Sequence, residues 1–150
     1  MSGTAAELPE PDYFPDVCEE ILGDWLRERH FFPFESYCSD TMSAWRRGRH
    51  FIRFSYWPRD APRFPVMVGM GVFREGWGLF GMRKPMLHGL GLWEVVEEED
   101  REVLRRAFRT RQELERLLAS IRDKALPHAE KLLDDPDRMR HAITHRVRAR

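Results

Sequence analysis

An arginine- and tryptophan-rich segment between positions 45 and 57 holds the residues of this 150-residue chain best suited to bind another molecule. Arginine and tryptophan are common at the energetically important positions of protein interfaces, because the guanidinium forms paired hydrogen bonds and the indole buries a large area. We therefore predict a partner-binding patch whose residues are exposed together: Trp45, Arg47, Arg49, Phe51, Arg53 and Trp57.

The same segment offers an alternative, which is stacking on single-stranded nucleic acid through the hairpin 45–57. Residues 47–54 partly match the signature of an RNA-binding strand, although Arg49 stands where a stacking aromatic belongs and His50 replaces a small residue. The chain carries no net charge, so it lacks the overall positive charge that favours nucleic acid. A protein partner is therefore preferred over nucleic acid.

A second candidate site lies in the strand-like stretch 64–73, where bulky and small residues alternate. Val68 and Met70 point to one face of such a strand, and Gly69 and Gly71 point to the other. Glycine inside a strand indicates that something approaches closely, either a neighbouring aromatic side chain or a ligand. The ligand alternative predicts a small-molecule binder or enzyme with a pocket on this glycine face, bounded by Gly69, Gly71, Trp77, Met86 and Trp93.

Other chemically suggestive patterns do not meet the requirements of the sites they resemble. Residues 76–81 satisfy G-x-G-x-x-G, but Pro85 and further glycines follow where a dinucleotide site needs the start of a helix. His141 and His145 have the spacing of two metal ligands on a helix, but they lie in an arginine-rich tail that repels cations. We therefore predict no catalytic residue, no metal site and no cofactor.

Composition indicates a globular protein rather than a disordered chain. Hydrophobic residues make up 42% and charged residues 33% of the sequence, and 150 residues suffice for one ordinary core. The two cysteines are too few for a disulfide framework. The first residues lack the pattern of a signal peptide, and no apolar run is long enough to span a bilayer. We expect a cytoplasmic protein with reduced thiols and with no membrane partner.

Hydrophobic periodicity predicts an α+β fold. A helix is expected over 16–30, a hairpin over 41–57, strands over 64–73, 77–82 and 92–96, a loop over 83–91, and helices over 98–108 and 110–125. Pro127 cannot continue the last helix and is expected to open a new turn that runs to Leu133. The short connections favour an antiparallel meander of about five strands, covered on one face by the N-terminal helix and the C-terminal helices. We predict a flexible acidic arm over 1–15, a single domain over 16–135, and an arginine-rich tail helix or frayed end over 136–150.

The order of these elements resembles a family of small bacterial α+β proteins of unknown function, some of which occur in toxin–immunity loci. The resemblance covers residues 16–133 and rests on the segments 31–34 (FFPF), 45–48 (WRRG), 64–72 (FPVMVGMGV) and 125–130 (ALPHAE). Phe32 lacks the glycine that usually precedes it in that family. The resemblance carries no catalytic residues, and it implies a binding protein.

These observations predict a non-enzymatic, cytoplasmic protein-binding module of immunity type, which blocks a partner by surface complementarity. The glycine-face pocket and the nucleic-acid-binding hairpin are the alternatives. The sequence does not specify the partner, the ligand or the oligomeric state.

Overall fold

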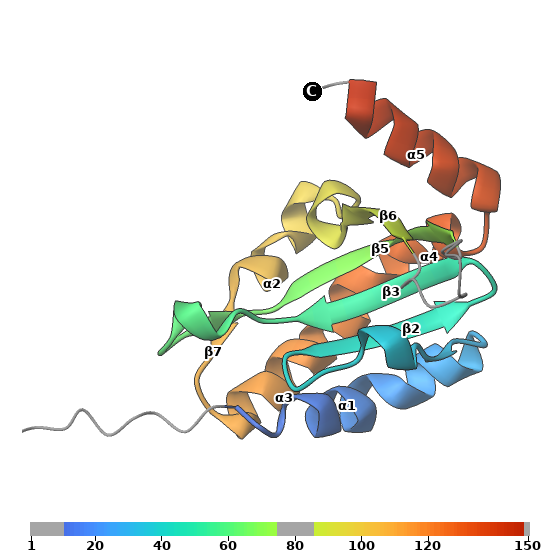
Figure 1. The fold of residues 1–150 in the computed structure, drawn as a ribbon. Coiled ribbons are helices and arrows are strands. Elements are labelled where there is room, and N and C mark those ends of the chain that lie inside the picture. Colours follow the sequence, from blue (N-terminus) through green and yellow to red (C-terminus); the bar gives the residue numbers. More distant parts are fainter. Residues whose placement is uncertain (1–10, 75–85, 149–150) are drawn as a thin grey trace, which may run out of the picture.

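The computed structural model describes residues 11–74 and 86–148, and it confirms the predicted α+β fold (Figure 1). Five strands form an antiparallel sheet in the order β1-β2-β3-β5-β6. They are β1 (Phe32–Pro33), β2 (Met42–Arg47), β3 (His50–Ser55), β5 (Met67–Arg74) and β6 (Met86–Gly91). A separate two-stranded ribbon pairs β4 (Phe64–Pro65) with β7 (Ala107–Phe108).

Helices cover one face of the sheet, as predicted. Figure 1 shows α3 and α4 behind the sheet, α1 along its lower side below β2, α2 beside the beginning of β5, and α5 extending from the opposite end of the domain. The α-helices are α1 (Phe14–Glu28), α2 (Glu102–Arg105), α3 (Arg111–Ser120), α4 (Leu126–Leu133) and α5 (Pro136–Arg148), with a π-helical turn, Ile121–Ala125, between α3 and α4.

The covered face of the sheet forms the main core. Trp45, Ile52 and Met70 are cross-strand neighbours on β2, β3 and β5, and all three are buried. Val68 and Met70 point into this core, which confirms the bulky face predicted from the alternation. Helix α3 begins where the sequence predicted, because the Thr110 side chain accepts a hydrogen bond from the Glu113 backbone N–H at 3.1 Å.

The first helix also follows its sequence pattern, with an earlier start. Val17, Leu22 and Leu26 are buried, as helical spacing predicts. The helix begins at Phe14 rather than at Asp16, since Pro15 is well suited to a first helical turn. Of the predicted arm 1–15, residues 1–10 lie outside the described residues.

The last strand of the sheet differs from the prediction. Residues 86–91 were expected to be a loop because they contain Gly89 and Gly91, yet they form β6. Gly89 pairs with Gly71 and Gly91 pairs with Gly69, so the glycines of two neighbouring strands lie side by side. The strand predicted over 92–96 is wrong, because Leu92–Glu94 is a 3₁₀ turn. The strand predicted over 77–82 lies outside the described residues.

Three further boundaries were set by tertiary contacts. The predicted strand 64–73 is divided into β4 and β5, and only β5 belongs to the large sheet. The predicted helix 98–108 is reduced to α2, because Ala107 and Phe108 pair with β4. The tail forms helix α5, which starts at Pro136 and buries Met139 against the core.

Candidate functional site

The predicted partner patch is divided between the two faces of the sheet. Arg47 pairs with His50 across a two-residue hairpin loop, so every cross-strand pair joins an odd residue to an even one. Odd-numbered residues of β2 and odd-numbered residues of β3 therefore point to opposite faces. Trp45 is only 2% exposed on the helix-covered face, and Phe51 is only 2% exposed on the other.

The prediction that Arg47, Arg49 and Phe51 are exposed together is therefore wrong. Arg49 lies exposed in the hairpin turn, whereas Arg47 is half-buried and Phe51 is buried. The same division separates the arginines and aromatics that the nucleic-acid alternative requires on one face. Arg53 and Trp57, however, both lie toward the face that the helices leave open.

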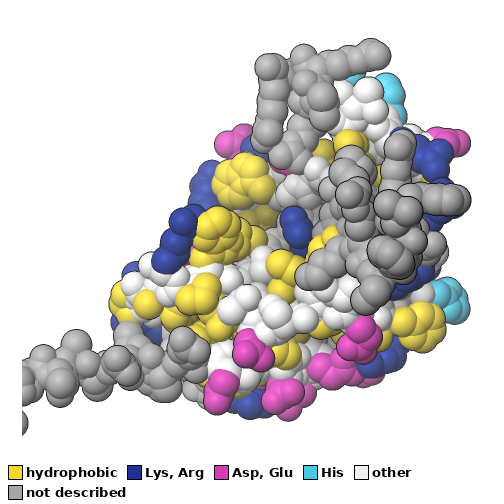
Figure 2. Space-filling model, in the orientation of Figure 1, with side chains coloured by type: hydrophobic (Ala, Val, Ile, Leu, Met, Phe, Trp, Pro, Cys, Tyr) yellow, Lys and Arg dark blue, Asp and Glu magenta, His cyan; other side chains and the backbone are white. Residues whose placement is uncertain are grey.

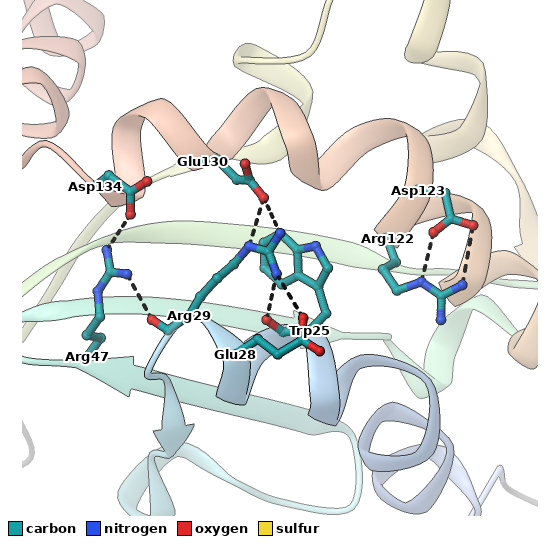
Figure 3. Close-up of polar contacts among 8 residues, drawn as sticks. All are labelled: Trp25, Glu28, Arg29, Arg47, Arg122, Asp123, Glu130 and Asp134. Atoms are coloured by element: carbon teal, nitrogen blue, oxygen red, sulfur yellow. Dashed lines mark hydrogen bonds and ion pairs between the residues drawn. The ribbon is translucent and has the colours of Figure 1, made fainter.

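Arg47 makes structural contacts within the domain rather than forming part of an exposed patch. Its guanidinium donates to the Arg29 carbonyl at 2.9 Å, to the Leu133 carbonyl, and to Asp134 Oδ1 at 3.2 Å, as Figure 3 shows in part. It thereby connects the end of β2 to the ends of α1 and α4. Arg29 extends this connection, because its Nε donates to Glu130 Oε1 on α4 at 2.7 Å (Figure 3).

On the open face of β5 and β6, the four paired glycines form a flat floor without side chains: Gly69, Gly71, Gly89 and Gly91. Two side chains from β3 extend over this floor. A Cβ atom on Gly89 would lie 2.9 Å from Phe51 Cζ, and one on Gly69 would lie 3.1 Å from Arg53 Nε. The aromatic side chain that crosses the glycines is thus Phe51, rather than one of the tryptophans, and it packs in a small cluster with Phe34, Ala44 and Phe73.

A groove of about 770 Å³ remains beside Phe51 and Arg53 on this face. Trp57, Met67 and Trp93 line it and are 43%, 38% and 40% exposed. Figure 2 shows this face, where hydrophobic side chains gather around a basic one. The remaining lining comes from β2, β3, β5, β6 and the segments beside them: Met42, Phe51, Arg53, Ser55, Val66, Val68, Gly69, Met70, Gly89, Leu90, Gly91, Leu92 and Leu104.

Arg53 is the one charged side chain among the described residues that line the groove. Arginines also stack on the two tryptophans that line it. The guanidinium of Arg59 lies 3.6 Å from the centre of the Trp57 ring, and those of Arg101 and Arg105 lie 5.5 and 4.9 Å from the Trp93 ring. These stacking contacts hold positive charge at the rim of an otherwise apolar groove.

The predicted glycine-face residues are partly brought together. Gly69 and Trp93 line the groove, whereas Gly71 lies under Phe51, outside the lining residues. Trp77 lies outside the described residues, and so does the side chain of Met86. Sequence reasoning assigned Arg53 to the hairpin patch and left Met67 out of the predicted pocket. Alternation along 64–73 was the signal for Met67, because it places Met67 on the same face as Gly69.

The other reactive side chains stand apart from this groove. No group of three metal-ligating side chains occurs in the described parts of the chain, and the rings of His141 and His145 are stacked 5.2 Å apart. His128 Nε2 lies 2.6 Å from Asp100 Oδ2, in a half-buried pair between α4 and the segment before α2.

The two cysteines differ in their surroundings. Cys18 is fully buried in α1, and this burial raises the pKa of its thiol far above the usual range. Cys38 is exposed, and its sulfur donates weakly to the Ala44 carbonyl at 3.4 Å. Within residues 11–74 and 86–148, no helix is both long and apolar enough to cross a membrane.

The chain was compared with protein-family models, with curated proteins and with solved structures, and no match was found in any of the three comparisons.

Proposed function

We propose that this protein binds a small ligand with an apolar body in the groove over the glycine face. The observation that carries the proposal is the gathering of exposed apolar side chains. Of the four large hydrophobic side chains that are exposed in the described residues, Trp57, Met67 and Trp93 all line this one groove. Phe32 is the fourth, and it lies on the edge strand β1.

The dimensions of the groove fit this function. Sites for small molecules usually enclose about 300–1,000 Å³ and combine apolar and aromatic walls with a few polar groups. Burying apolar surface contributes roughly 25 cal/mol per Å². The glycine floor supplies a flat surface without side chains, and its backbone is fixed by strand pairing with β3 and between β5 and β6. The site is therefore formed before the ligand arrives.

Titration with the neutral fluorescent probe N-phenyl-1-naphthylamine tests the proposal. Wild-type protein should enhance the probe's emission with saturation at one site. Gly91→Leu should abolish binding, because its Cβ would have ordinary contacts, 3.8 Å from Glu94 Oε2, while the rest of the side chain would fill the groove. Ser36→Leu adds the same side chain at an exposed position outside the groove lining, so it should bind like wild type. Equal binding by both variants would exclude the groove.

A protein partner that inserts an apolar side chain into the same groove is a second candidate, and it retains the immunity-type function expected from the sequence. The observation that favours it is the composition of the rim, where Trp57 and Trp93 each stack with arginine, as in interface hot spots. A photoreactive residue at Met67 should then crosslink one protein in the producing cell. That product should disappear in the Gly91→Leu background and persist with Ser36→Leu.

A further inference from the structure

We propose that the ligand carries an oxyanion, either a carboxylate or a phosphate, and that Arg53 binds it. This inference rests on the proposed function, since it takes the groove to be the ligand site. It specifies the ligand as an organic anion whose charged group lies over Gly69 and whose apolar body extends along Met67 toward Trp57 or Trp93.

Arg53 differs from the other half-buried arginines in the described part of the chain. Each of the others donates a hydrogen bond to an oxygen atom of the protein: Arg29, Arg46, Arg47, Arg101 and Arg122. Among the described residues, no hydrogen bond or ion pair engages the Arg53 guanidinium, which lies 5.9 Å from the centre of the Phe51 ring. With respect to residues 11–74 and 86–148, its five N–H donors are therefore available to a ligand.

Arg53 belongs to a row of donors that faces the groove. Ser55 follows it on the same face of β3, and Trp57 continues the alternation just beyond the strand, in extended conformation. Residues two apart on a strand are about 7 Å apart, so a guanidinium and a hydroxyl lie along one wall, with the Trp57 side chain beyond them. An oxyanion offers only acceptors and matches such a row, and a planar guanidinium holds it through two parallel bonds.

The charge around the groove favours an anion for a second reason. No carboxylate is among the described lining residues. Arg59, Arg101 and Arg105 add positive charge beside the groove through their stacking on the tryptophans. Glu94, at the edge, accepts a hydrogen bond from the Gly91 backbone N–H at 2.8 Å. The positive charges beside the groove therefore favour an anion over a cation.

The test compares four ligands that share a decyl body and differ in the head group. Decanoate, decyl phosphate, decanol and decyltrimethylammonium are titrated into wild-type protein by calorimetry below their micelle concentrations. We expect at least one of the two anions to bind about 30-fold more tightly than decanol, the range of a charge-assisted pair, and the cation to bind most weakly. Whichever of decanoate and decyl phosphate binds more tightly identifies the head group.

Two arginine variants locate the effect. Arg53→Met keeps the apolar stem but removes the charge, so it should bring the better anion to within about twofold of decanol without changing the affinity for decanol. Arg53→Lys should restore part of the preference, because it keeps the charge and loses the paired geometry. Arg49→Met, in the exposed hairpin turn, is the matched control and should behave like wild type.

The outcomes separate the two proposals. If decanol and both anions bind wild-type protein equally and Gly91→Leu blocks them, the groove binds ligands but the oxyanion inference is wrong. If the anion preference survives in Arg53→Met, the inference is also wrong. If neither the decyl ligands nor the naphthylamine probe binds at all, the proposed function itself fails.

Discussion

Replacing Gly89 by alanine should destabilise the fold strongly, whereas the same replacement at Gly91, two residues away on the same face of β6, should not. A Cβ atom on Gly89 would lie 2.4 Å from the Met70 carbonyl oxygen and 2.9 Å from Phe51 Cζ. A Cβ atom on Gly91 would lie 3.8 Å from Glu94 Oε2 and 4.0 Å from the Val68 carbonyl oxygen. The two sites therefore differ in the room that the neighbouring strand leaves.

The magnitude follows from what must move. The Phe51 ring can rotate away, but the Met70 carbonyl belongs to β5, which pairs with both β3 and β6. Relief at Gly89 thus requires separating paired strands, and we expect a cost at the upper end of the overpacking range, about 3 kcal/mol. At Gly91 the backbone has φ −78° and ψ 144°, which alanine adopts freely. Alanine there should stabilise by up to about 1 kcal/mol, by restricting the unfolded chain.

Urea unfolding followed by circular dichroism measures both effects. The dependence of free energy on urea concentration should be unchanged, and the midpoints should move in opposite directions. Both variants replace glycine by alanine in the same strand, so the effects of the substitution on the unfolded chain are nearly equal and cancel when the two variants are compared. Free energies of unfolding for Gly89→Ala and Gly91→Ala that agree to within about 0.5 kcal/mol would refute the strand spacing described above.

Three further predictions test other parts of the fold. Arg47→Met should lower the free energy of unfolding by about 2 kcal/mol, because it leaves backbone carbonyls without their donor, while Arg49→Met should change it by less than about 0.5 kcal/mol in the same urea assay. Ellman's reagent should modify Cys38 in the native protein and Cys18 only after unfolding, because Cys18 is buried with a raised pKa. Burial and neighbouring arginines lower the pKa of His50 from its ordinary 6.5, so the unfolded chain binds a proton before the folded chain does. The free energy of unfolding should therefore fall as the pH drops below 6.5, by less than about 1.4 kcal/mol per pH unit, and His50→Phe should flatten this fall.

Each of these has a contrary outcome. Equal destabilisation by the two arginine variants would mean that the contacts of Arg47 with α1 and α4 contribute nothing. Two thiols titrated at the same rate in native protein would place Cys18 at the surface. An unchanged pH profile in His50→Phe would assign the titration to other groups.

The fold class and much of the core could be predicted because they depend on local patterns. Alternation of bulky and small residues placed Val68 and Met70 on the core face of their strand, and helical spacing placed Leu22 and Leu26 inside. Thr110 was recognisable as a cap because the bond it accepts comes from a residue three positions away. Such relations involve residues close in sequence, so they can be recognised without knowing which distant segments come together.

The candidate site could be predicted only in part. The sequence indicated an open glycine face at Gly69 and a tryptophan boundary at Trp93, and both belong to the groove. It placed Arg53 in a hairpin patch that does not form, because the face on which a residue emerges depends on the length of the hairpin loop. It also assigned Gly89 and Gly91 to a loop, since glycine is ordinarily unfavourable inside a strand.

The sequence by itself determined which residues share a face within each strand and helix, since the periods of two and of about 3.6 residues are properties of the backbone. Only the tertiary structure decided which strands are neighbours. It set Gly69 and Gly71 opposite Gly91 and Gly89, extended Arg53 and Phe51 over them, and brought Trp57 and Trp93 to the same groove. Strand pairing is a contact between distant parts of the chain, so the glycine face and the arginine that extends over it exist only in the folded sheet.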